Sequence, residues 1–192
     1  MFGLSADLPY PSEEGIVCDA QTVRLLAPAY ADRRGELTAI LQYVYQSMVF
    51  SGRGDVRRAR LLADVAVSEM HHLDLLGGAL YRSGALPVFT SRPPRLFGFY
   101  NAFAVSFSAS PQRMILDDIA SETEAIRGYE QMLPRLRDEA VAAIVTRILA
   151  DEKLHLETFR TELESLCREG GCGKECRGGC GRECGGPEGE KK

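Results

Sequence analysis

Residues 151–158 read DEKLHLET, and this stretch places a carboxylate and an imidazole inside an otherwise apolar helix face. Glu152 and His155 stand three residues apart, which is nearly one helical turn, so their side chains share a face. Leu149 and Leu156 lie on that same face. A pair of polar, ionisable groups in a buried stripe requires a functional or structural reason.

A comparison of segments indicates that the chain consists of two related halves. Residues 36–43 read ELTAILQY and residues 122–129 read ETEAIRGY, so both fit Glu-x-x-Ala-Ile-x-x-Tyr. Residues 69–73 read EMHHL and residues 152–156 read EKLHL, so both fit Glu-x-x-His-Leu. Each half therefore predicts a helix with a lone inward glutamate, followed by a helix with an inward Glu-x-x-His.

Four stretches have the i, i+3, i+4, i+7 spacing of apolar residues that indicates amphipathic helices. They span residues 22–51, 54–84, 111–133 and 137–167. Asp55 and Ser110 are expected helix caps, and Pro111 suits a first helical position. With these boundaries, each of the four repeated glutamates lies near the middle of its helix, so the polar groups should meet at one height.

The connection between the second and third helices, residues 85–110, is too long for a tight reversal. It can travel the height of a bundle and start the third helix at the same end as the second. We therefore expect an all-α fold, a four-helix bundle with one long crossover. The expected division is an N-terminal extension at 1–19, the bundle at 20–167 and a flexible Gly/Cys-rich tail at 168–192.

Four buried carboxylates need compensating positive charge. An unpaired buried carboxylate destabilises a fold by several kcal/mol, whereas a whole domain is stable by only about 5–15 kcal/mol. No Lys or Arg falls on these helix faces at a matching height, and two neutral imidazoles cannot balance four negative charges. Two divalent cations can balance these four charges, so we predict a dinuclear metal site. Its candidate ligands are Glu36, Glu69, His72, Glu122, Glu152 and His155.

The two tyrosines of the repeated motif, Tyr43 and Tyr129, share the inward faces. Core packing with the hydroxyl bonded to a buried group is the interpretation we favour over a redox role.

Composition narrows the function classes. The chain of 192 residues is 45% hydrophobic and 26% charged, with a formal net charge of −4, which suits a globular domain and not a nucleic-acid binder. No stretch approaches the roughly 20 apolar residues of a membrane helix, and the N-terminus lacks the pattern of a secretory signal. We expect a cytoplasmic location, with the spore coat as an alternative.

Five of the six cysteines lie in the last 26 residues, and residues 19–166 contain none. Disulfides therefore do not hold the predicted core together. The tail spacing, C-x4-C-x3-C-x3-C-x3-C, matches no standard zinc or iron–sulfur pattern. Four interpretations of the tail remain open: metal capture, cross-linking to neighbouring chains, thiol reduction, and a solvated tail with no single partner.

The segments GELTAILQY, EMHHLDLLG, SETEAIRGY and DEKLHLETF together resemble the ferritin-like superfamily over residues 22–166. Within it they are most similar to manganese catalases, the spore-coat relatives of these catalases, and rubrerythrins. The chain departs from rubrerythrins because it lacks their pair of Cys-x-x-Cys knuckles, and it is shorter than the large manganese catalases.

The resemblance implies one terminal glutamate and one histidine for each cation. Glu36 would act with His72 and Glu122 with His155, while Glu69 and Glu152 would bridge or approach both cations. Oxygen and imidazole ligands suit two Mn or two Fe ions.

The expected function is an oxidoreductase that decomposes hydrogen peroxide, as a catalase or a peroxidase, with Glu152 and Glu69 as candidate catalytic carboxylates. The alternative is a ferritin-like structural, coat or iron-storage protein without significant peroxide turnover. Hydrogen peroxide or dioxygen would be the small-molecule partner, and we expect a homo-oligomer.

Overall fold

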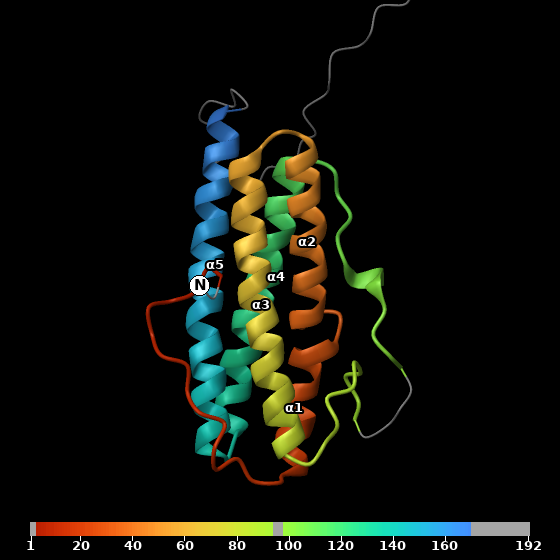
Figure 1. Ribbon diagram of the computed structural model, residues 1–192, viewed down its shortest axis with the longest axis vertical. Helices are drawn as coiled ribbons and strands as arrows, with labels where there is room; N and C mark the ends of the chain where they lie inside the picture. Colours follow the sequence, from red (N-terminus) through yellow and green to blue (C-terminus); the bar gives the residue numbers. More distant parts are fainter. Residues whose placement is uncertain (1–2, 94–97, 170–192) are drawn as a thin grey trace, which may run out of the picture.

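The computed structural model describes residues 3–93 and 98–169, and within these ranges it contains helices and no strand (Figure 1). The helices are α1 (Ala20–Ala31), α2 (Glu36–Gly52), α3 (Val56–Arg82), η1 (Ala102–Ala104), α4 (Pro111–Met132), η2 (Leu133–Arg135) and α5 (Glu139–Glu169). No helix of this described part is long and apolar enough to cross a membrane.

The four long helices, α2 to α5, form the predicted bundle, and α1 lies below α2 at the lower end in Figure 1. The described parts of the connection between α3 and α4, residues 83–93 and 98–110, lie along the outside of the bundle, and both helices begin at its upper end (Figure 1). The prediction of one long crossover is therefore confirmed. The helix caps are also as predicted. At the start of α3 the Asp55 side chain accepts a hydrogen bond from Arg58 N. At the start of α4 the Ser110 side chain accepts one from Arg113 N, and Pro111 is the first residue of that helix.

The prediction of one continuous first helix is wrong, because residues 32–35 separate α1 from α2. Gly35 passes close to the last turn of α1: a Cβ there would stand 2.3 Å from Ala29 O and 2.6 Å from Pro28 O. Glycine alone permits this approach. Glu36 is consequently the first residue of α2, and the prediction that it lies in mid-helix is corrected.

The interior contains two hydrophobic clusters, one toward each end of the bundle. The lower cluster includes Leu26, Leu76 and Ile148, and the upper one includes Phe50 and Phe159; all five are at most 1% exposed. Their burial supplies the main driving force for folding. The predicted ligands occupy the layer between these clusters.

The N-terminal residues 3–19 begin beside the middle of α5 and run down the outside of the bundle before entering α1 (Figure 1). At the other end α5 continues to Glu169, two residues beyond its predicted end. The prediction of a Gly/Cys-rich flexible tail concerns residues that, from 170 onward, lie outside the described part of the chain.

Candidate metal centre

Each of the four long helices contributes to the predicted ligand set. Glu36 begins α2, Glu122 lies in the middle of α4, and α3 and α5 each contribute a Glu-x-x-His pair. All six side chains are buried, with between 0% and 4% of each residue exposed. The inward orientation that the repeat predicts is therefore observed for every one of them.

The six side chains form two groups that share two members. One group is Glu36, Glu69, His72 and Glu152, and the other is Glu69, Glu122, Glu152 and His155. Within each group, one potential ligand atom from every residue lies within 4.8 Å of the others. The shared glutamates, Glu69 and Glu152, are the pair that the resemblance assigns to a bridging position.

Both imidazoles present Nδ1 to the interior of the cluster. His72 Nδ1 lies 2.9 Å from Glu69 Oε2 and 3.2 Å from Glu152 Oε1. His155 Nδ1 lies 2.9 Å from Glu69 Oε1 and 3.7 Å from Glu152 Oε2. The ring planes are inclined by 29° with centroids 5.9 Å apart. The two rings thus face the shared glutamates from opposite halves of the repeat.

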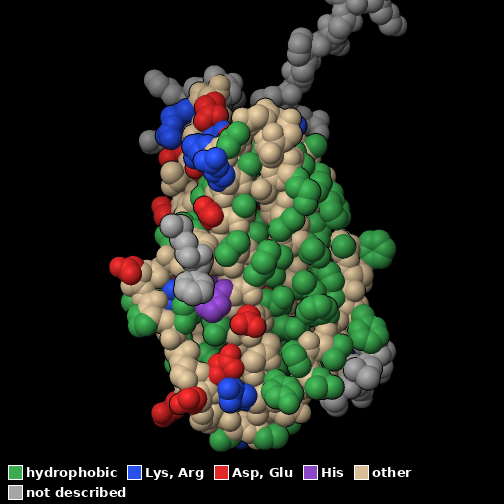
Figure 2. Space-filling model, viewed as in Figure 1, with side chains coloured by type: hydrophobic (Ala, Val, Ile, Leu, Met, Phe, Trp, Pro, Cys, Tyr) green, Lys and Arg blue, Asp and Glu red, His purple; other side chains and the backbone are tan. Residues whose placement is uncertain are grey.

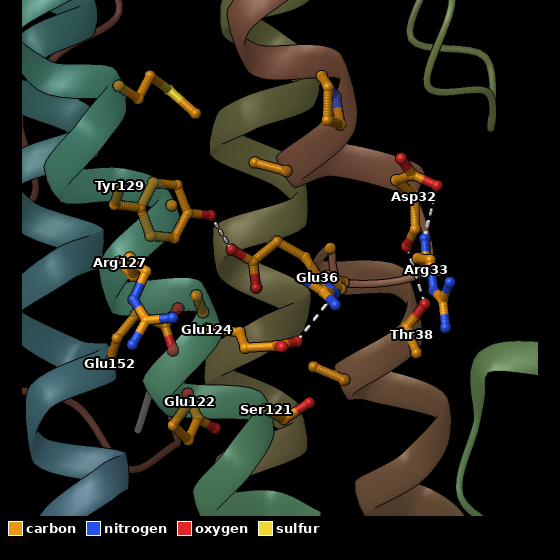
Figure 3. A pocket seen from close by; sticks show the side chains of 18 of the residues that line it. Asp32, Arg33, Glu36, Thr38, Ser121, Glu122, Glu124, Arg127, Tyr129 and Glu152 are labelled. Atoms are coloured by element: carbon orange, nitrogen blue, oxygen red, sulfur yellow. Dashed lines mark hydrogen bonds and ion pairs between the residues drawn. The ribbon is translucent and has the colours of Figure 1, made fainter.

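The repeated tyrosines connect the two halves. The Tyr43 hydroxyl donates a hydrogen bond to Glu122 Oε1, and the Tyr129 hydroxyl donates one to Glu36 Oε1. Figure 3 shows Tyr129 pointing at the Glu36 carboxylate. Burial, together with the nearby carboxylates, raises the pKa of both phenols well above the ordinary value. Each tyrosine is therefore a fixed donor that orients one glutamate, as the core-packing interpretation predicts.

The electrostatics of the cluster divide its carboxylates into two kinds. Burial and the charges of Glu152 and Glu69 raise the pKa of Glu36 well above its usual range, and burial and Glu152 do the same to the pKa of Glu122. Burial also acts to raise the pKa of Glu69, but the neighbouring His72 and His155 outweigh it and lower that pKa overall.

Burial and Glu69 act to raise the pKa of Glu152, but its hydrogen bonds with Glu122, His155 and His72 lower it to about 2, so both shared glutamates hold negative charge inside the fold. Within the described residues, no Lys or Arg pairs with any of the four glutamates.

Three buried atoms of the cluster make no hydrogen bond within the described part of the chain: Glu69 Oε1, Glu152 Oε1 and His155 Nδ1. The distance between Glu69 Oε1 and His155 Nδ1 is 2.9 Å, yet the angles do not suit a hydrogen bond. Lone pairs that converge in this way fit a cation, which accepts electron pairs from several ligands at once. The donor set, two nitrogens and four carboxylates, fits a pair of divalent cations.

A polar layer that was not predicted from the sequence lies behind His72. His72 Nε2 lies 3.0 Å from Asp151 Oδ2, and Asp151 Oδ1 lies 2.6 Å from Arg147. Both residues are buried. The expectation that no Arg lies at this height is therefore wrong for Arg147, which sits one turn before Asp151 on α5 and pairs with it. The spacing of Arg147, Asp151 and His155 on one helix face was the signal that could have identified them.

Burial acts to raise the pKa of Asp151, but His72, Arg147 and the Tyr10 hydroxyl outweigh it and lower that pKa overall. Asp151 is therefore an anion that accepts from His72 Nε2, which leaves Nδ1 free to face the cluster. Such a contact fixes the ring and strengthens it as a ligand.

On the carboxylate side, a cavity of about 570 Å³ reaches the cluster from outside (Figure 3). Its inner wall includes all four glutamates and both tyrosines, and its outer wall includes several arginines. Arg34 Nε and Glu124 Oε2 form an ion pair of 2.9 Å in this lining. The imidazoles are absent from the lining, so a small molecule would approach the cluster from the glutamate side.

Comparison with known families agrees with this geometry. A model of the ferritin-like domain matches residues 32–168, which is most of the chain and contains every predicted ligand. The chain belongs to the ferritin-like family. Comparison with curated protein sequences gave no match.

Solved structures with this ferritin-like fold include KatB, a manganese catalase from Anabaena, with a TM-score of 0.74 and 21% identity over 93% of this chain and 85% of that one. Bacterioferritins are similar as well. The Desulfovibrio desulfuricans protein, described with a diiron site, has a TM-score of 0.66 and 22% identity over 79% of this chain and 82% of its own.

BfrA, a bacterioferritin from Mycobacterium tuberculosis, also has a TM-score of 0.66, with 21% identity over 80% of this chain and 89% of that one. At these identities the likeness establishes the fold alone.

Proposed function

We propose that this ferritin-like protein binds two Mn or two Fe ions and decomposes hydrogen peroxide, as a catalase or a peroxidase. The observation that carries the proposal is the pair of overlapping ligand groups that share Glu69 and Glu152, at the end of a cavity open to small molecules. When bound, two redox-active ions would supply the two-electron exchange that peroxide decomposition requires.

The residues around the cations would hold them and manage protons. Glu36 with His72, and Glu122 with His155, would each hold one ion, while Glu69 and Glu152 would contact both. The Tyr43 and Tyr129 hydroxyls each donate to one oxygen of Glu122 and Glu36, respectively, which restrains the orientation of these carboxylates.

Proton acceptance would fall to Glu152 where only one of its oxygens contacts the cations, with Glu69 as its counterpart, since Glu152 Oε1 has no hydrogen-bond partner in the described part of the chain. Glu152 also lines the cavity, where a peroxide proton would arrive.

The test is to load metal-free protein with Mn²⁺ or Fe²⁺, count the bound ions, and measure oxygen release from hydrogen peroxide. A parallel assay supplies a reductant and follows peroxide loss without oxygen release. Turnover in either assay supports the proposal and distinguishes a catalase from a peroxidase. A preparation that contains two ions per chain and turns over peroxide in neither assay would eliminate it.

Iron storage is the second candidate function, because bacterioferritins share the fold over about four fifths of this chain. In that case the cluster would oxidise Fe²⁺ with dioxygen and pass iron into a hollow assembly. A structural coat protein, in which cations mainly stabilise the fold, is a related alternative.

Particle size separates the candidates. A small oligomer that accepts about two Fe per chain favours the peroxide enzyme, whereas a large hollow particle that takes up many Fe per chain favours storage. A large, insoluble assembly without iron uptake favours the coat protein. Spore fractionation would also distinguish a coat location from a cytoplasmic one.

A further inference from the structure

The two imidazoles of the metal centre are held from outside in different ways. Ser68 stands where the second half of the repeat has Asp151, since each directly precedes the glutamate of a Glu-x-x-His segment. Asp151 reaches across to His72 Nε2. Ser68 supplies no carboxylate, and its buried hydroxyl makes no hydrogen bond within the described residues. One half of the centre therefore lacks the carboxylate that the other half has.

The chain's N-terminal residues occupy the corresponding place. Gly3 lies against α3 so closely that a Cβ would stand 2.6 Å from Ser68 N and 2.3 Å from Asp64 O. Leu4 N donates to Asp64 O at 3.1 Å, and the Leu4 carbonyl lies 2.7 Å from His155 Nε2. A backbone carbonyl thus accepts from His155 where the repeat would predict a carboxylate.

We call residues 3–10 the N-terminal strap, because the same segment continues across α5. Ala6 N donates to Asp151 Oδ1 and the Tyr10 hydroxyl donates to Asp151 Oδ2, both at 2.6 Å. Arg147 donates to the carbonyls of Ala6 at 2.8 Å and Leu8 at 3.1 Å, and its guanidinium lies 4.0 Å from the Tyr10 ring centroid. The strap is therefore fixed at several points behind both imidazoles.

We propose that the N-terminal strap is part of the metal centre, with the Leu4 carbonyl as the positioning group for His155. The affinity of the cation position beside His155 would then depend on the Leu4 carbonyl, whereas the position beside His72 depends on the Asp151 carboxylate. This inference rests on the proposed dinuclear site. A partner on the outer nitrogen fixes the tautomer that leaves Nδ1 free, and its loss typically weakens metal binding ~10–100-fold.

A glycine substitution tests this in the full-length chain. Gly3 has φ +69° and its Cβ would collide with backbone atoms of α3, whereas Gly15 has φ +87° and its Cβ would meet nothing within 4 Å. Gly3→Ala and Gly15→Ala therefore carry similar backbone strain, but only Gly3→Ala displaces Gly3 and the adjoining Leu4 from α3, while Ala6 and Tyr10 keep their contacts with Asp151. Thermal unfolding of both variants verifies that the bundle remains folded.

The measurement is a Co²⁺ titration of metal-free protein, with the exchangeable imidazole N–H protons followed by proton NMR. We expect Gly3→Ala to weaken one of the two binding constants ~10–100-fold and to remove the protected N–H signal of one imidazole. Gly15→Ala should match the wild type. Adding Ser68→Asp to Gly3→Ala should restore the weakened constant, because the new carboxylate takes the place that Asp151 has in the other half.

Equal binding by Gly3→Ala and the wild type would overturn the inference while leaving the proposed function intact. An equal loss at both positions would also overturn it, since that indicates general loosening. Conversely, a protein that shows the unequal loss but never turns over peroxide would retain the strap's role and eliminate the peroxide assignment.

Discussion

At the scale of single residues, the cluster can balance its charge with protons or with cations. Burial favours the neutral forms of Glu36 and Glu122 by raising their pKa values. Burial acts to lower the pKa of His155, but Glu69 and Glu152 raise it to about 10, and the pKa of His72 is raised as well. Protonated histidines then balance the two ionised, shared glutamates. Two divalent cations produce the same net charge after four protons leave.

Metal affinity should therefore rise with pH. Binding removes protons from Glu36, Glu122, His72 and His155, whose pKa values are all raised. Mass action then favours the loaded form as protons become scarce. Titrations with Mn²⁺ between about pH 6 and pH 8 should show affinity that increases across the range, with proton release in weakly buffered solution. Affinity that is constant with pH would contradict this charge balance.

Asp118, one helical turn before Glu122, is a further buried acid that is not among the predicted ligands. Burial raises its pKa to about 8, although Gln42 and Gln46 each donate to Oδ1 at 2.8 Å. From about pH 4 to pH 8 the unfolded chain releases a proton that native Asp118 keeps. The free energy of unfolding therefore falls as the pH rises through this window, by up to about 1.4 kcal/mol per pH unit.

Asp118→Asn should remove this contribution, because the amide is neutral at every pH. Urea unfolding of both proteins in chelator should show the variant gaining stability relative to the wild type between pH 5 and pH 8. The metal cluster titrates in both proteins, so its effect cancels in the difference. Parallel pH profiles would show that Asp118 does not carry a proton in the native state.

At the scale of elements, periodicity was enough to predict the bundle but not its interruption. Residues 32–35 read DRRG and carry no apolar side chain, but a gap of one turn in the apolar spacing does not by itself distinguish a polar turn of one helix from a break between α1 and α2. The break depends on contact between Gly35 and the carbonyls of α1, which is tertiary information. The inward ligands were predictable because helical spacing alone determines their face. The contact of the Leu4 carbonyl with His155 was not predictable, since a backbone group carries no sequence signal.

Gly35→Ala tests the cause of this break. The new Cβ would meet backbone oxygens of α1 that cannot rotate away, so we expect destabilisation of about 1–3 kcal/mol and weaker metal binding through displaced Glu36. Gly128→Ala in α4 is the matched control, because its Cβ meets nothing within 4 Å. The control should be neutral or more stable by up to about 1 kcal/mol in urea unfolding. Equal stability of both variants would contradict this explanation.

At the scale of the whole molecule, the metal centre has a closed side and an open side. The N-terminal strap covers the imidazoles behind α3 and α5, while the cavity reaches the glutamates from the other side. A further face is apolar: Figure 2 shows hydrophobic side chains gathered over α2 and α3. The exposed large hydrophobic residues of these two helices include Leu41 and Met48 in α2 and Val67 and Met70 in α3. Such a surface is typical of a protein–protein contact.

We expect a second copy of this chain to cover that face. Light scattering during size exclusion should then give a mass that is a multiple of the single chain, and Met48→Glu, at a position 64% exposed, should reduce it. Since Met48 lies outside the cavity lining, metal content should not change. A monomer at micromolar concentration would contradict this expectation.

The central claim is that two cations lie between four helices, each ion in one of the overlapping ligand groups. Anomalous diffraction from crystals of the Mn²⁺-loaded protein tests it most directly. We predict two peaks, one beside Glu36 and His72 and one beside Glu122 and His155, and no peak in Glu69→Ala, which removes a ligand common to both groups. A wild-type cluster without any peak, or with its ions held by other residues, would contradict the account.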